Sequence, residues 1–459
     1  MSLDLKKEDI GKLLEINLKE KAKDGKQIIH KGFLVEFNSN DLKVKLEDNG
    51  YNIGIDLKHI EKINFLDKKV TLGKPSKINL KENKDLPNVY YIGTGGTIGT
   101  HVDYNTGGVY MCRSPEEIIS TTPEIANIIN IKQTSSVVMK GSEDMTFNDW
   151  ALISSEVFKA ISDSNIDGVI ITHGTDTLSL TGSAISFMIE GINKPVLLIG
   201  AQRSPDRASF DGSMNLICAS HFIKEKIPGV FTVMHGSMND DFCYVIRSTK
   251  SKKMHTSRRD SFRAVNDKPI AKVYKNGKIE YLKDKKELIL EYQKKFEKPV
   301  LKNKFSEKVE IIKAYPSSNP EVIDFFVEKG CKGLIIEGTA LGHVPTLYDK
   351  DKDSYGKESW IPSIKKAVEK GLIIIMTSQS VFGRVNSKVY ANLRYAKNAG
   401  VNYLDSHDML CDVAYIKLSL ALERFKEKQD VLEYMKTNVS GEISEKELAD
   451  SFESSLENL

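Results

Sequence analysis

The chain has 459 residues, 40% of them hydrophobic and 28% charged, which is enough for about three globular domains of about 150 residues each. Its 66 Lys and Arg residues nearly balance its 63 Asp and Glu residues, leaving a formal net charge of +3. This composition argues against global disorder and against a strongly basic nucleic-acid-binding coat, although a local basic patch stays open.

The N-terminal segment mixes charges of both signs and lacks the apolar core of a signal peptide. No uncharged apolar run reaches the roughly 18 residues that a membrane helix needs. The five cysteines are scattered and form no C-x-x-C pair, which argues against a disulfide framework and against a zinc site. We therefore expect a cytoplasmic protein with no membrane span and no bound metal.

The N-terminal part of the chain reads as short strands. Apolar and polar residues alternate within residues 28–65, as at Leu42 and Val44, and polar turn residues separate the runs. This pattern predicts a small β-barrel-like domain over residues 1–84. Residues 6–23, which precede the clearest strands, are expected to be partly helical.

After the first domain the pattern changes to apolar runs that end in glycine and alternate with helical segments. Such alternation is typical of an α/β fold with a mostly parallel, doubly wound sheet, and we predict this domain over residues 85–300. A second α/β unit with a helical tail is predicted over residues 301–459. The predicted fold class is therefore α/β, with a small β module in front of two α/β domains.

Polar residues follow several predicted strands at their carboxyl ends, where ligands bind in doubly wound sheets. The first such loop is residues 93–99, GTGGTIG, whose glycines permit a sharp turn and whose Thr97 supplies a hydroxyl. A glycine-rich loop can also cradle phosphate. That alternative is weaker because the lysine of G-x-x-x-x-G-K-[ST] and the full G-x-G-x-x-G spacing are both missing.

Two further loops combine hydroxyl and carboxylate groups. Thr175 and Asp176 stand side by side directly after a predicted buried strand, although both residue types are also common helix caps. Ser142 and Glu143 lie in the polar segment 140–146, which suits the binding of a zwitterionic substrate. The same segment also suits the N-terminal cap of the following helix.

The basic run at residues 250–263 has two interpretations. A charge run is usually a solvated loop. Alternatively, the run buries one lysine, and because burial favours the neutral amine, that lysine can act as a base. His173 has no second histidine at ligand spacing, so we interpret it as a structural turn residue.

In this order, the segments resemble the L-asparaginase/glutaminase family. The motifs that carry the resemblance are T-G-G-T-I at 94–98, S-E-D-M-T at 142–146, H-G-T-D-T at 173–177, G-A-Q-R at 200–203 and K-M-H-T at 253–256. The first and third motifs, both at strand ends, form a specific combination. The resemblance begins near Asn88, extends through the second α/β unit and implies an asparaginase-like pair of α/β domains.

Further segments resemble one branch of that family, the D subunits of archaeal glutamyl-tRNA(Gln) amidotransferases. They are E-G-T-A-L-G-H-V-P at 337–345, S-Q-S-V-F-G-R-V-N at 378–386 and N-V-S-G-E-I at 438–443. This branch implies a glutaminase that supplies ammonia to a partner, the E subunit, which uses ATP and Mg to convert Glu-tRNA(Gln) to Gln-tRNA(Gln). It also implies a homodimer of this chain within a heterotetramer, and no cofactor bound by this chain itself.

The resemblance also assigns catalytic roles. Thr97 matches the nucleophile of the first motif, Thr175 the second catalytic threonine, Asp176 its carboxylate neighbour and Lys253 the family lysine. Amide hydrolysis through an acyl-enzyme needs a hydroxyl that attacks the carboxamide and a base that takes its proton. A neutral Lys253 would take the proton of Thr175 while Asp176 orients the amine. Which threonine forms the covalent bond stays open.

The remaining assignments concern the substrate. Ser142 and nearby backbone amides are expected to hold its α-carboxylate, and Asp176 its α-ammonium. Glu143 stands where bacterial asparaginases often have glutamine, and an acid there favours contact with the ammonium. Family members carry a lid tyrosine after the first motif; Tyr110 is the better-placed candidate here and Tyr104 the other, with core packing as the alternative for Tyr110.

Two other functions compete with the glutaminase prediction. A free-standing L-asparaginase is disfavoured because such enzymes lack the extra N-terminal module and the distal motifs. A catalytically inactive scaffold or tRNA-binding module is disfavoured by the nearly balanced charge. It is also disfavoured because the four predicted catalytic residues are present together.

Overall fold

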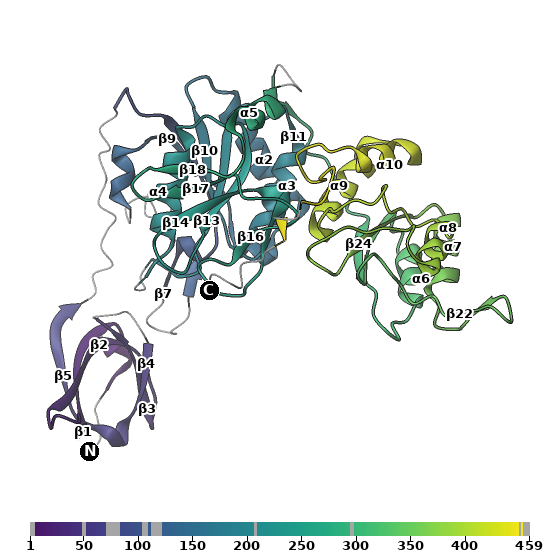
Figure 1. The fold of residues 1–459 in the computed structure, drawn as a ribbon. Helices are drawn as coiled ribbons and strands as arrows, with labels where there is room; N and C mark the ends of the chain where they lie inside the picture. The colour runs from purple at the N-terminus through teal and green to yellow at the C-terminus, as the bar shows by residue number, and fades with distance from the viewer. Residues whose placement is uncertain are drawn as a thin grey trace.

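The computed structural model describes residues 5–47, 52–69, 83–102, 109–111, 122–205, 209–293, 298–448 and 451–452. Figure 1 shows a small all-β module at the N-terminus, a central α/β lobe and a C-terminal α/β lobe. Within those ranges, no helix is both long enough and apolar enough to cross a membrane. The predicted domain limits at residues 84 and 300 stay predictions.

The N-terminal module is a five-stranded antiparallel sheet with the order β4-β3-β2-β1-β5. Its strands are β1 (Lys12–Lys21), β2 (Gln27–Phe37), β3 (Asp41–Leu46), β4 (Asn52–Asp56) and β5 (Ile60–Lys69). The prediction of a helix within residues 6–23 is wrong, apart from a short 3-10 turn (Lys7–Asp9). Strand β1 pairs with both β2 and β5, which keeps the segment extended. Its residues Leu14 and Ile16 lie on the same side of the strand and join the module's core.

The central lobe contains an eight-stranded sheet with the order β18-β17-β14-β13-β12-β10-β6-β9. Its strands are β6 (Asn88–Gly95), β9 (Asn130–Lys140), β10 (Gly168–Thr172), β12 (Pro195–Ile199), β13 (Gly229–His235), β14 (Phe242–Arg247), β17 (Ala271–Tyr274) and β18 (Ile279–Tyr281). The run from β9 to β13 is parallel, and the remaining three strands are antiparallel. The predicted α/β class with a largely parallel sheet is confirmed.

Helices cover both faces of this sheet. They are α2 (Phe147–Ser162) and α3 (Leu178–Met188) on one face, and α4 (Gly212–Ile223) and α5 (Lys285–Gln293) on the other. Successive strand residues therefore enter different cores: Val169 and Ile171 pack with α2 and α3, whereas Ile170 packs with α4. Burial on both faces explains why these strands read as continuous apolar runs.

The strand order reverses between β6 and β10. The chain leaves β6 toward β9 on one side, then crosses to β10 and continues to β12 on the other side. The loops that follow β6 and β10 consequently diverge at the carboxyl edge of the sheet. A crevice forms at such a point, and ligands bind there in doubly wound folds.

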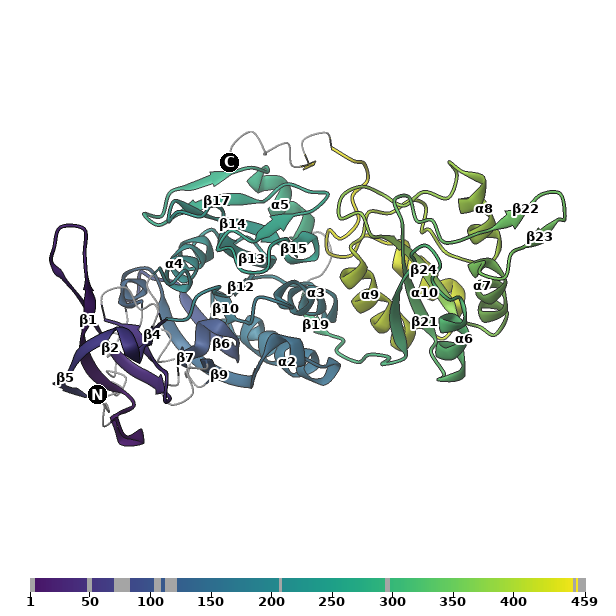
Figure 2. The same ribbon diagram turned by 90° about the horizontal axis from the view of Figure 1, so that it is seen from below.

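The C-terminal lobe has a parallel three-stranded sheet of β20 (Val309–Lys313), β21 (Gly333–Gly338) and β24 (Ile373–Ser378). One face carries α6 (Glu321–Glu328), α7 (Trp360–Glu369) and α8 (Ala391–Asn398). The other carries α9 (Cys411–Arg424), which is followed by α10 (Lys428–Lys436). Helix α9 contacts α3, so it packs the two lobes together (Figure 2).

Short strand pairs and 3-10 turns complete the fold. The pairs are β7 (Thr100–Val102) with β8 (Val109–Met111), β11 (Ile189–Glu190) with β19 (Val300–Leu301), β15 (Ser251–Lys253) with β16 (Phe262–Ala264), and β22 (Tyr348–Asp349) with β23 (Ser354–Tyr355). The remaining 3-10 turns are η2 (Leu57–His59), η3 (Thr97–Gly99), η4 (Pro123–Asn127), η5 (Ser142–Asp144) and η6 (Ser248–Lys250). The β15–β16 hairpin and the turns η3 and η5 carry residues of the candidate site.

Candidate active site

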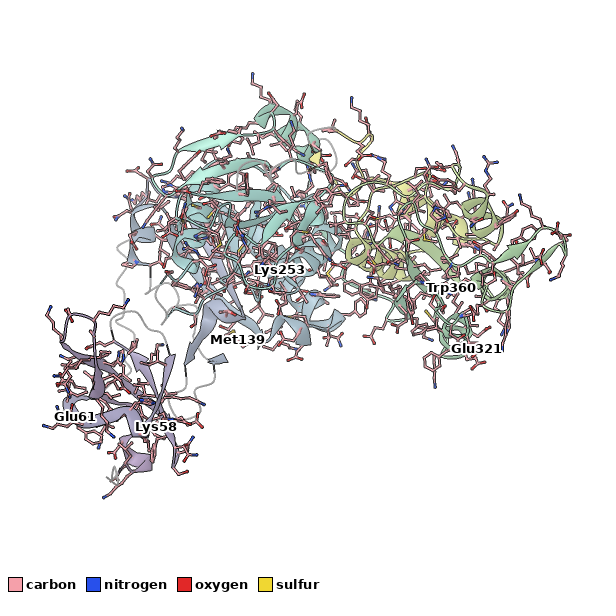
Figure 3. The ribbon with its side chains drawn as sticks, turned by 60° about the horizontal axis from the view of Figure 1, so that its bottom comes forward. Lys58, Glu61, Met139, Lys253, Glu321 and Trp360 are labelled. Atoms are coloured by element: carbon pink, nitrogen blue, oxygen red, sulfur yellow. The ribbon has the colours of Figure 1, made fainter. Side chains whose placement is uncertain are left out.

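A cavity of about 380 Å³ lies where the loops after β6, β9, β10 and β12 meet the β15–β16 hairpin. It contains every predicted catalytic residue together with Ser142 and Glu143. Its lining residues are Gly96, Thr97, Gly141, Ser142, Glu143, Gly174, Thr175, Asp176, Gln202, Lys253, Thr256 and Ser257. The structure thus brings together residues that lie up to about 160 positions apart in the sequence (Figure 3 labels Lys253).

Glycines allow these loops to pack backbone against backbone. Gly96 has φ +76°, and a Cβ atom on it would lie 2.3 Å from the Cα atom of Gly174. A Cβ atom on Gly174 would in turn lie 2.7 Å from the side chain of Ser142. Only glycine fits such contacts, so these two positions bring Thr97 and Thr175 to the same cavity.

Lys253 occupies the centre of the site. Its Nζ atom lies 2.9 Å from the Thr175 hydroxyl oxygen and 2.7 Å from a carboxylate oxygen of Asp176. The Lys253 side chain is 13% exposed, whereas that of Asp176 is 65% exposed. An amine in this position can exchange a proton with the threonine hydroxyl, while the carboxylate fixes the amine and faces the solvent.

The helix-cap alternative does not account for Thr175 or Asp176. The N-cap of α3 is Thr177, and its side chain makes no cap hydrogen bond. The Thr177 hydroxyl instead donates to the Ser142 carbonyl oxygen at 2.6 Å, which ties the loop after β10 to the turn after β9. Thr175 and Asp176 are therefore left to face the cavity and Lys253.

Segment 140–146 caps the following helix, as predicted, and its residues Ser142 and Glu143 line the cavity, whereas substrate binding there stays a prediction. Thr146 is the N-cap of α2 in a capping box with Asp149, and the Lys140 ammonium contacts the same carboxylate at 2.7 Å. Burial acts to raise the pKa of Asp149, but Lys140 and the hydrogen bonds from Thr146 hold it below its ordinary value. Ser142, almost fully buried, lines the cavity instead. Thr146 thus fixes the end of this segment to α2, while Ser142 at its start lines the cavity.

His173 has a structural place beneath the cavity. It is buried, and burial lowers its pKa to about 4, so the imidazole is neutral. Its Nδ1–H donates to the Gly174 carbonyl oxygen at 2.8 Å, and its Nε2 accepts from the Thr181 hydroxyl at 2.8 Å. The Trp150 indole N–H donates to the same hydroxyl oxygen at 3.0 Å. This chain of bonds fixes the loop after β10 and leaves no ring nitrogen for the substrate.

Ion pairs neutralise much of the basic run. Lys252 pairs with Asp412, Arg258 and Arg263 both pair with Asp260, and Arg259 pairs with Asp240. The solvated-loop interpretation fits only the exposed tip, residues 254–257. In the hairpin, Lys253 stands opposite the buried Phe262, and this pairing anchors the strand that carries the amine.

Besides three glycines, three cavity residues with polar side chains were not predicted as site residues. They are Gln202, Thr256 and Ser257. The Gln202 amide nitrogen donates to the Ser261 hydroxyl at 2.9 Å, which links the loop after β12 to the hairpin. The signal for two of them was present, because Gln202 and Thr256 fall within the motifs G-A-Q-R and K-M-H-T.

The tyrosine predictions fall largely outside the described residues. Tyr104 lies outside them, and for Tyr110 only the backbone is described, as part of β8. Their roles stay predictions. No group of three or more His, Cys, Asp or Glu side chains that could hold a metal occurs in the described parts of the chain.

Two family models match the chain. The model "Asparaginase, N-terminal" matches residues 88–287, and the model "Glutaminase/Asparaginase C-terminal domain" matches residues 308–435. Together they cover the central and C-terminal lobes, including all the loops that line the cavity.

Relatives that match along nearly the whole chain are D subunits of glutamyl-tRNA(Gln) amidotransferase. The protein from Pyrococcus furiosus is 43% identical over 92% of this chain and 93% of its own, and that from Thermococcus kodakarensis is 44% identical over 90% and 89%. Among solved structures, the thermostable L-asparaginase from T. kodakarensis has a TM-score of 0.67 and 25% identity, covering 78% of this chain and 99% of its own. L-asparaginase I from Vibrio cholerae, with a TM-score of 0.62 and 24% identity over 78% and 99%, shows the same fold.

Proposed function

Because the chain belongs to the L-asparaginase/glutaminase family, and within it to the glutamyl-tRNA(Gln) amidotransferase D subunits, we propose that it hydrolyses glutamine to supply ammonia to a partner protein. The observation that carries the chemistry is the double contact of Lys253, to the Thr175 hydroxyl and to the Asp176 carboxylate. A second hydroxyl, that of Thr97, lines the same cavity.

The reaction proceeds in two steps. A threonine oxygen attacks the side-chain carboxamide carbon of glutamine while the Lys253 amine takes the hydroxyl proton. The C–N bond then breaks, and the leaving nitrogen receives that proton and departs as ammonia. Water hydrolyses the resulting ester, which releases glutamate and restores the hydroxyl. Backbone N–H groups of one of the glycine-rich turns are expected to hold the developing oxyanion.

Thr175 is the hydroxyl in contact with Lys253, and Thr97 is the second candidate for acylation. Mass spectrometry of the trapped acyl-enzyme distinguishes them. The site of the added mass in the unaltered chain, and its loss in either Thr97→Val or Thr175→Val, identifies the nucleophile.

The charged ends of glutamine find complementary groups in the cavity. Asp176 and Glu143 are exposed and line the cavity, where they are placed to hold the α-ammonium. The buried Ser142 and neighbouring backbone amides are placed to hold the α-carboxylate. A second acid at position 143 disfavours substrates that present another carboxylate there. These roles explain why the pocket is polar and open to solvent on the side of Asp176.

The complete reaction needs a partner. We propose that the amidotransferase E subunit accepts the ammonia and amidates Glu-tRNA(Gln) with ATP and Mg, and that two copies of each protein form a cytoplasmic heterotetramer. The D subunit from Pyrococcus furiosus matches 92% of this chain, which must include part of the N-terminal module, whereas the solved L-asparaginases leave about a fifth of this chain unmatched. The matched length therefore favours the amidotransferase over a free-standing asparaginase.

The test measures ammonia release from glutamine and from asparagine, with and without the co-purified E subunit and Glu-tRNA(Gln). Lys253→Met should lower glutamine turnover by about 10²- to 10⁴-fold because it removes the base. Lys365→Met, which removes an exposed lysine of α7, is the matched control and should leave turnover unchanged. Equal rates for Lys253→Met and the unaltered chain would refute the site. Fast asparagine hydrolysis that ignores the partner would indicate a free-standing asparaginase.

A further inference from the structure

The hairpin that carries Lys253 is tied to the C-terminal lobe on its outgoing strand. Lys250, directly before the hairpin, forms an ion pair of 2.8 Å with Asp408, and both side chains are almost completely buried. Two residues later, Lys252 pairs with Asp412 in the first turn of α9. Both aspartates belong to the segment that begins the helix packed between the lobes.

The alternation of a β-strand links these pairs to the active site. Lys252 and Lys253 are neighbours in β15, and successive side chains of a strand point to opposite sides. Lys252 therefore reaches α9 while Lys253 reaches Thr175 and Asp176. A shift of the strand relative to α9 moves the Lys253 amine relative to the threonine hydroxyl.

The returning strand is tied to the same place. After β16, the Asn266 side-chain amide donates to the Asp408 carbonyl oxygen at 3.1 Å and to the Gly383 carbonyl oxygen at 3.2 Å. The second carboxylate oxygen of Asp408 accepts the Ser444 backbone N–H at 2.9 Å. Both ends of the hairpin thus converge on Asp408 and its immediate surroundings.

We propose that Lys252–Asp412 and Lys250–Asp408 are positioning pairs, through which the C-terminal lobe sets the distance between the Lys253 amine and the Thr175 hydroxyl. The proposal rests on the proposed function, because it takes Lys253 as the base. Lys253 itself is a long, flexible side chain, and the two ties fix the backbone from which it extends. A proton-transfer contact of 2.9 Å tolerates little displacement, so the second α/β unit takes part in catalysis by positioning the base.

The pair Lys252–Asp412 is the better one to break, because it is partly exposed whereas removal of Lys250 or Asp408 leaves a buried charge and can prevent folding. Lys252→Met and Asp412→Asn should each lower kcat for glutamine about tenfold, with KM within about twofold, since only the alignment of the base changes. Lys252→Arg keeps the ion pair and should restore kcat. Lys302→Met, which removes a pair with Glu190 away from the hairpin, is the matched control and should behave like the unaltered chain.

A second readout does not depend on activity. The rate at which an amine-acylating reagent labels Lys253, relative to the exposed Lys365 of the same chain, should rise in Lys252→Met and Asp412→Asn and stay constant in Lys302→Met. Unchanged kcat and unchanged labelling in both pair variants would overturn the proposal. So would an equal loss in Lys302→Met, which would show a general loss of stability. If the unaltered chain releases no ammonia from glutamine, the proposed function fails, and the labelling still decides whether α9 positions Lys253.

Discussion

The eight-stranded and three-stranded sheets are built alike through their parallel parts, but they use the polar residues at their strand ends differently. In the central lobe, Thr175, Asp176 and Thr97 follow β10 and β6 and face a cavity. In the C-terminal lobe, Gln379 follows β24 and donates to the carbonyl oxygens of Ala314 and Glu337, which ties the end of β24 to the ends of β20 and β21.

The difference shows that the parallel sheet supplies an edge where loops meet, and that the chemistry depends on which polar side chains the loops turn toward a cavity. At the first sheet, close contacts of glycines hold the loops, and the two threonines and the aspartate line the cavity. At the second sheet, side chains do the holding: Thr377 donates to the Ile336 carbonyl oxygen at 3.2 Å, and Ser378 donates to that of Ala340 at 2.5 Å. Substitutions that exchange or remove these two kinds of residue test the difference.

The largest effect is expected from the same substitution made at the two sheets. Thr175→Val removes the hydroxyl that Lys253 contacts and should lower glutamine turnover by about 10³-fold or more. Thr377→Val removes a buried hydroxyl that donates to the Ile336 carbonyl oxygen of the C-terminal sheet. It should lower the free energy of unfolding by about 1 kcal/mol and leave turnover within about twofold.

Ammonia release and urea unfolding of the two variants decide the comparison. If Thr377→Val lost turnover as Thr175→Val does, the second sheet would contribute chemistry after all, and the contrast between the sheets would be wrong. Unchanged turnover in Thr175→Val would show that the central cavity is not the active site.

The next effect tests whether glycine contacts hold the catalytic loops. Gly96 and Gly330 have nearly the same conformation, with φ +76° and +78°, but only Gly96 has a backbone neighbour within reach of a Cβ atom. Gly330→Ala should therefore lower the free energy of unfolding by about 1 kcal/mol, the strain of a left-handed alanine. Gly96→Ala adds a clash with Gly174 and should also lower glutamine turnover about 100-fold, because the two threonine loops must separate.

Unfolding and turnover measured on both variants separate strain from loop contact. Equal turnover in Gly96→Ala and Gly330→Ala would mean that the close approach to Gly174 has no effect on the catalytic geometry.

Much of the fold could be predicted from periodicity. Continuous apolar runs mark strands buried on both faces, as with β10, whose residues enter two different cores. The prediction of a helix within residues 6–23 was wrong. It followed the local composition, because the segment K-L-L-E-I-N-L-K is rich in Lys, Leu and Glu, which favour helices. Pairing with β2 and β5 outweighs that local preference, and no local signal reports a partner that lies about 50 residues away.

The candidate site was predicted from motifs, and what they missed has physical reasons. Ser257 lines the cavity only because distant loops meet, and a serine does not by itself indicate a site. The contacts of Lys250 with Asp408 and of Lys252 with Asp412 join residues about 160 positions apart, so the sequence left open whether the basic run is a solvated loop or buries a lysine. Charge alone could not reveal that most of its partners are aspartates from elsewhere in the chain.

The smallest effect is expected within residues 142–146, where one polar side chain lines the cavity and another caps a helix. Ser142 lines the cavity, and Thr146, four residues later, caps α2 through its bond with the backbone N–H of Asp149. Ser142→Ala should raise KM for glutamine by about tenfold, because a hydrogen bond to the charged α-carboxylate is lost, with little change in unfolding. Thr146→Ala should lower the free energy of unfolding by about 1 kcal/mol and leave KM unchanged. Thr146→Ser keeps the cap and serves as its control. If both alanine variants changed KM alike, the cap would set the position of Ser142. Thr146 and Ser142 would then not have separate structural and binding roles.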